Sequence, residues 1–281
     1  MKGKVVLITG ATAGIGLETA KVLAEKGARI YFIARDAAKA ELAKDIIVQA
    51  GKGRSSKYYI ADLSSQQSIR NVVSRIREDL PVIDVLINNA GAVYDRFTLS
   101  EDNIEMTIAT NHFAYFLLTN LLLENIKAAP AGRIVNVSSG SNKMGKVDLE
   151  SFTSDRGYQI LKAYAQSKLV NILFTNYLAR QLAGTGVTVN CLHPGRVRTD
   201  IGKKNTGWLS SLAWSLFLKY SSVSVEKGAM TSVYLASSPE VANITGEYFA
   251  KEKIAPYNPL AKNERLQKAV WDMSLELCPV D

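Results

Sequence analysis

The stretch KVVLITGATAGIG, residues 4–16, decides the fold. It opens with the short apolar run KVVLITG, which ends in glycine as a buried parallel strand often does. Gly10, Gly14 and Gly16 then lie at the turn into a helical pattern that starts near Ile15. At such a turn glycines let the backbone bend tightly and let a pyrophosphate approach, while the helix N-terminus faces the phosphates. The spacing GxxxGxG predicts a nucleotide site, with an ordinary glycine turn as the alternative.

Strand and helix patterns alternate along the rest of the chain. This alternation predicts an α/β fold, a Rossmann-type doubly wound parallel sheet of about seven strands with helices on both faces. Strands are expected at residues 4–10, 28–35, 56–64, 82–91, 132–141, 187–200 and 244–250. Helices are expected from near Ile15, at 37–50, 66–79 and 103–129, from near Gly157, and at 225–237 and 260–277, with a polar loop at 144–157.

Composition and charge narrow the class of protein. The 281 residues are 47% hydrophobic and 21% charged, which suits one large domain and excludes disorder or a fibrous repeat. The net charge of +8 comes from 34 scattered basic residues, so we expect an anionic small ligand and no nucleic acid. Cys191 and Cys278 have no metal-ligand spacing, so no metal is expected, and they suit a reducing cytosol. Because Met1–Lys4 lead directly into a strand and no apolar run reaches about 20 residues, we expect a cytoplasmic protein.

The end of the second strand carries the residue that selects the cofactor. An acidic side chain here holds a ribose diol, whereas a basic one accepts a 2′-phosphate. Arg35 follows the strand end at Ala34, which favours NADP(H) over NAD(H), and Asp36 is expected to cap the next helix. A solvated strand-end charge is the alternative for Arg35. The third and fourth strands end in Asp62–Leu63 and Asn88–Gly91, at the edge of the sheet where ligands bind.

A tyrosine and a lysine one helical turn apart form the candidate catalytic pair. Tyr164 and Lys168 are four residues apart, so an α-helix places them on one face. A neighbouring positive charge lowers the pKa of a tyrosine from about 10, which would let Tyr164 exchange protons near neutral pH. Tyr158 and Lys162 repeat this spacing and are the alternative. We favour the first pair because it heads an amphipathic run, whereas Tyr158 directly follows the helix breaker Gly157.

Two further polar positions accompany this pair. Asn111 lies in the mostly apolar stretch NHFAYFLLTNLLL, where an amide serves either the core or a functional hydrogen bond, and both readings stay open. The strand at 132–141 delivers Ser138 and Ser139 at its C-terminal end, which is the ligand edge of the sheet. Asn111 and these serines are therefore candidates for the same site.

The motifs as a set resemble the short-chain dehydrogenase/reductase family. TGATAGIG, NNAG, NHFAYFLL, NVSS, YAQSK and HPGRVRTD occur in the family's order, and RIVNVSS, SKLVNILFTNYLARQL and GTGV resemble its retinol-dehydrogenase-like branch. The resemblance implies a catalytic tetrad of Asn111, Ser139, Tyr164 and Lys168. It implies cofactor contacts by Gly10, Thr12, Gly14, Ile15, Gly16, Arg35, Asp62, Leu63, Asn89, Tyr164, Lys168, Pro194, Val197 and Thr199. Membrane-bound relatives carry an N-terminal apolar anchor that is not found in this sequence, so a membrane location is not carried over.

By this resemblance, residues 1–281 are expected to form a single dinucleotide-binding and catalytic domain, an NADP(H)-dependent oxidoreductase that interconverts a carbonyl and an alcohol. Residues 207–220 take the position of the family's substrate loop and are apolar on nearly every side. They predict a lid near 200–222 and an apolar substrate such as a retinoid, a lipid aldehyde or a steroid. Packing of 207–220 against the core is the alternative, and a peripheral membrane contact through it and a homodimer stay open. The rival functions are a non-catalytic NADP(H)-binding redox sensor or scaffold and a reductase of a ring double bond.

Overall fold

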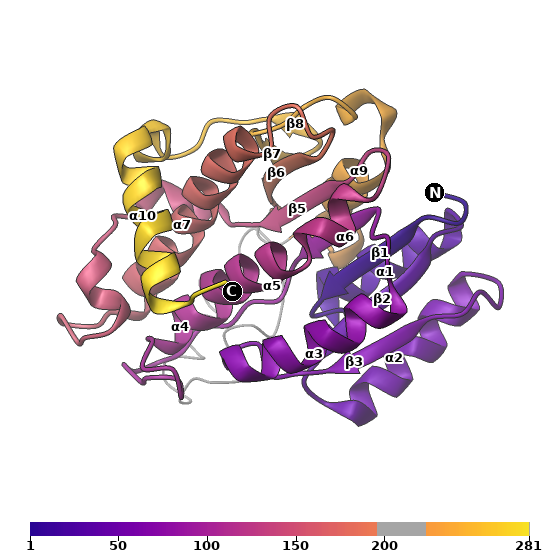
Figure 1. Ribbon diagram of the computed structural model, residues 1–281, viewed down its shortest axis with the longest axis horizontal. Coiled ribbons are helices and arrows are strands. Elements are labelled where there is room, and N and C mark those ends of the chain that lie inside the picture. The colour runs from indigo at the N-terminus through magenta and orange to yellow at the C-terminus, as the bar shows by residue number, and fades with distance from the viewer. Residues whose placement is uncertain (196–222, 281) are drawn as a thin grey trace.

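The computed structural model describes residues 1–195 and 223–280, which form one sheet flanked by helices (Figure 1). Within these residues eight strands form the sheet, in the order β3-β2-β1-β4-β5-β6-β7-β8. The strands are β1 (Val5–Thr9), β2 (Arg29–Ala34), β3 (Lys57–Ile60), β4 (Val85–Asn88), β5 (Arg133–Val137), β6 (Thr188–His193), β7 (Tyr248–Ala250) and β8 (Lys253–Ile254). β1 to β7 pair in parallel, as predicted. Because the strand order reverses between β1 and β4, a ligand crevice is expected outside their C-terminal ends.

The described sheet has one strand more than predicted. β8 pairs antiparallel with the end of β7, and both of its residues are exposed. The two residues between the strands, Lys251 and Glu252, have φ angles of 51° and 62°. A strand of two residues has no alternating pattern, and its turn uses no glycine, so neither usual signal marks it in the sequence.

Helices cover both faces of the sheet, as predicted (Figure 1). One face packs against α3, α5, α7 and α10, and the other against α1, α2 and α9. The α-helices are α1 (Gly14–Glu25), α2 (Ala37–Ala50), α3 (Gln66–Asp79), α4 (Met106–Ile108), α5 (Ala114–Leu121), α6 (Leu123–Lys127), α7 (Ile160–Gln181), α9 (Val225–Ser237) and α10 (Glu264–Leu277). Shorter turns are η1 (Ala109–Phe113), η2 (Gly140–Met144), η3 (Leu149–Phe152), η5 (Pro239–Val241) and η6 (Pro259–Lys262).

The single helix expected at 103–129 is interrupted. It consists of α4, the π-helical turn η1, α5 and α6, and Leu122 separates the last two. Glu105 caps α4 by accepting hydrogen bonds from two backbone N–H groups. In η1 the buried Asn111 bonds to Ala92, outside its own helix, and π turns are often found where a side chain serves a site. An apolar run in the sequence does not reveal such an interruption.

The segment between β5 and α7 is more structured than the polar loop expected at 144–157. It contains η2 and η3, and the fully buried Phe152 of η3 packs edge-on against Phe113, with 5.9 Å between ring centroids. The N–H of Glu105 donates to the Phe152 carbonyl at 2.7 Å, which fastens the segment to the start of α4. α7 begins at Ile160 and not near Gly157, because the φ angle of Gly157, 75°, is left-handed.

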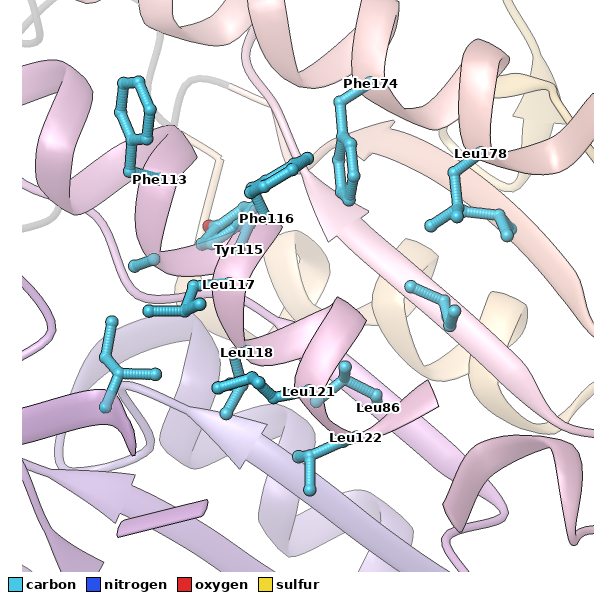
Figure 2. Close-up of a cluster of buried hydrophobic side chains, with 14 of the residues drawn as sticks. Leu86, Phe113, Tyr115, Phe116, Leu117, Leu118, Leu121, Leu122, Phe174 and Leu178 are labelled. Atoms are coloured by element: carbon cyan, nitrogen blue, oxygen red, sulfur yellow. The ribbon is translucent and has the colours of Figure 1, made fainter. Parts of the chain in front are cut away.

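The chain's own C-terminal helix covers the outer face of α5 and α7. Figure 2 shows the aromatic and leucine side chains of these two helices gathered in the core beneath. Trp271 of α10 stacks on Tyr177 and lies edge-on to Phe116, with 4.8 and 5.1 Å between ring centroids. His112 Nε2 and Ser274 Oγ are 2.8 Å apart, which joins η1 to α10. A homodimer through these helices, left open by the sequence, would have to include or displace α10.

Three expectations concern features beyond the sheet. Among residues 1–195 and 223–280, the helices are too short or too polar to cross a membrane. Cys191 and Cys278 are buried free thiols. The cofactor contacts predicted for Val197 and Thr199, the lid near 200–222 and the apolar stretch 207–220 lie outside the described residues.

Candidate active site

A cavity of about 500 Å³ lies at the C-terminal ends of the strands, where the sheet order reverses. Unpredicted residues contribute to its walls, among them Tyr94, Thr110 and Val225. The structure also brings together there every described residue for which a cofactor contact is predicted, namely Gly10, Thr12, Gly14, Ile15, Gly16, Arg35, Asp62, Leu63, Asn89, Tyr164, Lys168 and Pro194. The topology thus joins residues that are spread over most of the sequence.

Glycines keep one wall of the cavity free of side chains. Gly10 and Gly14 have φ angles of 71° and 56°, in the region that side-chain-bearing residues rarely adopt. A Cβ atom on Gly16 would lie 2.3 Å from the Gly10 carbonyl oxygen and 2.5 Å from Asn89 Nδ2. The N-terminus of α1 can therefore approach the end of β1 closely, which leaves bare backbone N–H groups for an anion.

Asn89 joins the ends of β1 and β4. Its Nδ2 donates to the carbonyls of Thr9 and Gly10 at 2.9 and 3.2 Å, and its N–H donates to the Thr9 hydroxyl at 2.9 Å. These bonds fix the position of the glycine turn. Asn89 therefore shapes the cavity wall, and its predicted contact with a cofactor stays a prediction.

Arg35 lies at the rim of the cavity directly after β2 and is exposed. The next residue, Asp36, accepts from the N–H of Lys39 at 3.0 Å and pairs with its Nζ at 3.3 Å. These bonds lower the pKa of Asp36 and confirm the predicted helix cap. The acid is committed to the start of α2, so the cation is the group left to face a ligand here.

The side chains of Tyr164 and Lys168 lie next to each other on α7. Lys168 Nζ is 5.8 Å from the ring centroid of Tyr164 and 5.7 Å from that of Tyr115. Lys168 is 3% exposed, and its Nζ donates to the Val137 carbonyl at the end of β5 at 3.1 Å. The predicted pair is thus assembled at the inner end of the cavity.

The alternative pair, Tyr158 and Lys162, is not assembled. Tyr158 precedes α7, and its hydroxyl donates to the Tyr94 carbonyl at 2.8 Å and lies 3.0 Å from the Thr107 hydroxyl. Lys162 is exposed to solvent. The two pairs have equal spacing in the sequence, but only Tyr164 lies within α7, so only this tyrosine is placed beside its lysine.

Burial opposes the charged form of both Tyr164 and Lys168. It lowers the pKa of Lys168 to about 8 and raises the pKa of Tyr164 above its usual value, which a hydrogen bond with the Ser139 hydroxyl lowers only in part. The expectation that the tyrosine pKa is lowered is wrong for the described chain, because desolvation of the buried phenol raises this pKa by more than the hydrogen bond with Ser139 lowers it. The raised pKa keeps Tyr164 protonated at neutral pH, as a proton donor must be.

The two serines after β5 have different partners. The buried Ser138 donates its hydroxyl to the Lys168 carbonyl at 2.7 Å and so fastens β5 to α7. Ser139 is partly exposed, accepts from the N–H of Ser141 at 3.2 Å and hydrogen-bonds Tyr164. Ser139 is therefore the serine that lies beside the phenol.

Asn111 holds the cavity wall against α7. Its Nδ2 donates to the Ala92 carbonyl and to the Ser167 hydroxyl, both at 3.0 Å. Its Oδ1 accepts from the N–H of Ala92 at 2.7 Å. The side chain is thus fully hydrogen-bonded, to α7 and to the segment that follows β4, which lines the cavity.

Tyr115 belongs to these surroundings although the sequence analysis did not select it. It is fully buried, its hydroxyl donates to the Ala90 carbonyl at 2.7 Å, and burial raises its pKa well above the usual value. The Tyr115 hydroxyl therefore stays protonated, and its uncharged ring packs beside the Lys168 ammonium. Its position four residues after Asn111 is the signal that could have identified it.

The chain belongs to the short-chain dehydrogenase family, whose model, described as short chain dehydrogenase, matches residues 4–210. It is thus an oxidoreductase of this family. Over 290 residues it is 42% identical to retinol dehydrogenase 14 of Mus musculus, with 98% of this chain and 85% of that protein covered. Over 286 residues it is 38% identical to retinol dehydrogenase 11 of Homo sapiens, with 100% and 88% covered. These relatives confirm the predicted resemblance to the retinol-dehydrogenase-like branch.

Solved structures agree with the family. An uncharacterised protein from Mycobacterium Paratuberculosis matches with a TM-score of 0.78 at 30% identity, over 99% of this chain and 94% of that one. A short-chain dehydrogenase/reductase from Serratia marcescens matches with a TM-score of 0.70 at 25% identity, over 88% and 96%. The doubly wound fold predicted from the sequence is thereby confirmed.

Proposed function

We propose that the protein is an NADP(H)-dependent oxidoreductase that interconverts a carbonyl and an alcohol on an apolar substrate. The observation that carries this proposal is the position of Tyr164 beside Lys168 and Ser139, at a cavity with a glycine wall. A placed proton donor and a dinucleotide site are the two parts that carbonyl reduction requires. The names of the relatives, retinol dehydrogenases 11 and 14, support an alcohol as the reduced form.

The residues around the cavity fit a phosphorylated dinucleotide. Its volume of about 500 Å³ lies within the range of roughly 300–1,000 Å³ found for ligand sites. Gly10 and Gly16 leave space for a pyrophosphate at the N-terminus of α1, and Arg35 at the rim suits a 2′-phosphate. When bound, the cofactor supplies the hydride for reduction or accepts it in oxidation.

Tyr164 is the proposed general acid. As the carbonyl oxygen of the substrate gains negative charge, the phenol donates its proton to that oxygen, and the Ser139 hydroxyl donates a hydrogen bond to it. Lys168 stabilises the tyrosinate that remains, because its ammonium lies beside the ring. In the oxidative direction the tyrosinate accepts the proton of the alcohol. Asn111 acts through positioning, since it holds Ala92 in the cavity wall.

Exposed apolar side chains support an apolar substrate. Leu161 lies one helical turn before Tyr164 and is 54% exposed, and Met144 ends η2 and is 68% exposed. Gly145, the next residue, lies against α7, because a Cβ on it would come within 2.9 Å of the Leu169 Cβ. Two large apolar side chains are therefore exposed on η2, which starts after Ser139, and on α7, which carries Tyr164, and a hydrocarbon substrate that reaches these elements would cover them.

A non-catalytic redox sensor or scaffold is the rival function. It would need the glycine turn and Arg35, but not a phenol, an ammonium and a serine hydroxyl brought together. A reductase of a ring double bond would use the same groups and differs in its substrate. The cytoplasmic location, a membrane contact through 207–220 and a homodimer stay predictions.

Turnover with NADPH and with NADH tests the proposal, against a panel from small polar ketones to long-chain aldehydes, retinal and a cyclic enone. We expect NADPH-preferring reduction of the apolar carbonyls. NADPH binding without turnover of any member would support the sensor. Turnover confined to small polar ketones would contradict the apolar substrate, and reduction of the enone alone would support a double-bond reductase.

Replacing Arg35 with alanine is expected to weaken NADPH binding by roughly 10- to 100-fold and to leave NADH binding unchanged. The reason is that only the phosphorylated cofactor carries the group that Arg35 would bind. Quenching of protein fluorescence on titration with each cofactor measures both affinities. Arg29→Ala, which removes an exposed arginine at the other end of β2, is the matched control. Equal losses for NADPH and NADH would contradict the assignment.

Carbonyl reduction is expected to slow as the pH rises through about 8. The pKa of Lys168, lowered by burial to about 8, means that its charge is lost above this pH, while the raised pKa of Tyr164 keeps the phenol protonated. Measured as kcat between about pH 6 and about pH 9.5, the decline should approach about tenfold per pH unit. Lys168→Met should be slow throughout and show no inflection.

Unfolding would not explain this decline. The pKa of Lys168 is lower in the folded chain than its ordinary value of 10.5, so the unfolded chain binds more protons between about pH 8 and 10.5. This group alone therefore makes the fold more stable as the pH rises through that window. A flat profile of kcat across the window would show that the reaction does not need the ammonium.

A further inference from the structure

A second cavity, of about 430 Å³, lies at the end of α7, between the loop before β7 and the turn that leads into α10. Among the described residues, none lines both cavities. In space, the start of β7 lies beside the C-terminal end of α7, and both border the second cavity. This cavity therefore lies at the N-terminal edge of the parallel strands. The first cavity lies at their C-terminal edge, so the two cavities lie at opposite ends of the strands.

Buried amides form the floor of the second cavity. Asn176 and Gln267 line it, and each donates an amide hydrogen to the Ala261 carbonyl, at 3.0 and 2.6 Å. Gln267 is 2% exposed, and its Oε1 has no hydrogen-bond partner among the described residues. A buried polar atom of this kind usually has a partner, and a bound water or ligand group supplies one where the protein does not.

Two cations that form no ion pair with the described residues lie at the rim. The Arg180 guanidinium makes one long hydrogen bond, 3.4 Å to the Asn176 carbonyl, and Lys262 Nζ lies 5.9 Å from the Tyr257 ring centroid. Neither cation forms an ion pair within the described part of the chain, and its acidic residues contribute nothing to the cavity lining. Lys268 does form such a pair, with Asp272 at 2.6 Å. Among residues 1–195 and 223–280, no ion pair therefore neutralises the positive charge of the rim.

A hydroxyl adds to the preference for an anion. Tyr257 OH accepts from Asn176 Nδ2 at 3.4 Å, and within residues 1–195 and 223–280 its hydrogen is donated to no acceptor. Guanidinium, ammonium and phenol are the donors that proteins use for phosphate oxygens.

We propose that this second cavity binds a small organic phosphate, with the phosphate group held by Arg180 and Lys262. The cavity is open to solvent and its volume exceeds that of a phosphate ion, so an organic part can extend along the Tyr257 ring and the amide floor. The residues of this phosphate site differ from those of the proposed dehydrogenase site. Phosphate binding is therefore measured without enzyme turnover, and its failure would leave the proposed function untouched.

Calorimetric titration with glycerol 3-phosphate tests the proposal, in the presence of excess NADP⁺ so that phosphate does not enter the first cavity. We expect binding to the unmodified chain, and at least about tenfold weaker binding to the double variant Arg180→Ala/Lys262→Ala. Arg29→Ala/Lys26→Ala removes the same two charges elsewhere and should bind as the unmodified chain does. Arg180→Lys/Lys262→Arg keeps both charges and should retain most of the binding.

Cosedimentation with phosphatidylcholine vesicles, with and without phosphatidic acid, identifies the source of the phosphate. Binding of glycerol 3-phosphate supports a free metabolite, and binding of only the phosphatidic acid vesicles supports a lipid headgroup, provided that Arg180→Ala/Lys262→Ala removes it. Absence of binding to both probes overturns the proposal. Equal binding by Arg180→Ala/Lys262→Ala and by the control variant also overturns it. Melting temperatures within about 2 °C of the unmodified chain show that the variants fold.

Discussion

Replacing Tyr164 with phenylalanine is expected to lower kcat for carbonyl reduction by roughly 100- to 10,000-fold, the range found when a general acid is lost. The change removes one hydroxyl and keeps the ring that packs beside Lys168. NADPH affinity should be nearly unchanged, because the proton donor acts on the substrate oxygen. Single-turnover rates and a fluorescence titration with NADPH separate these two effects.

Tyr158→Phe is the matched control for that variant. It removes a hydroxyl of the same kind from the alternative pair, one that donates to the Tyr94 carbonyl. The lost hydrogen bond is worth about 1 kcal/mol, so we expect kcat to stay within about tenfold of the unmodified chain. Normal turnover by Tyr164→Phe would refute the assignment of the acid. Loss of turnover through Tyr158→Phe instead would move the acid to that residue.

Replacing Gly16 with alanine is expected to destabilise the fold by about 1–3 kcal/mol and to weaken NADPH binding at least about tenfold. Helix propensity alone predicts the opposite, since alanine within a helix is favoured over glycine by about 1 kcal/mol. The new Cβ would lie 2.3 Å from the Gly10 carbonyl oxygen and 2.5 Å from Asn89 Nδ2. Asn89 is held by its own hydrogen bonds and cannot yield, so the steric cost decides the sign.

Gly140→Ala provides the comparison for Gly16→Ala. A Cβ on Gly140 would meet the His193 ring at 3.5 Å, an ordinary contact, so its melting temperature should change little. Urea unfolding of both variants and NADPH titration of Gly16→Ala measure the two expected losses. A Gly16→Ala variant with unchanged stability and affinity would show that α1 has room to move away from β1.

Local pattern was sufficient for the sheet and for most of the first cavity. The strands β1 to β7 are mostly apolar, and polar residues or glycine follow each of them within two residues. Parallel topology then brings those strand ends to one edge, so Gly10, Arg35, Asp62 and Pro194 line one cavity without any local signal that they meet. Helical spacing identified Tyr164 and Lys168 only together with Gly157, the helix breaker that marked Tyr158 as lying outside the helix.

Packing between distant segments determined the features that the sequence did not reveal. The π turn around Asn111, the burial of Phe152 and the ring of Tyr115 over Lys168 all depend on contacts between distant segments. The pKa of Tyr164 was misjudged for the same reason, because spacing shows which charge is near but not how deeply the groups are buried. The second cavity has no sequence signal, since its floor and rim come from four separate segments.

The position of α10 has a consequence for protein synthesis. His112, next to Asn111 in η1, bonds to Ser274, and Gln66 Nε2 of α3 donates to the Leu277 carbonyl at 2.8 Å. Segments that are synthesised early, α3 and η1, thus form hydrogen bonds with α10, which is synthesised much later. While α10 remains inside the ribosome, Phe116 and Tyr177 have no Trp271 to cover them, and a nascent chain exposes this apolar face to chaperones. This apolar face is therefore covered only after α10 has emerged.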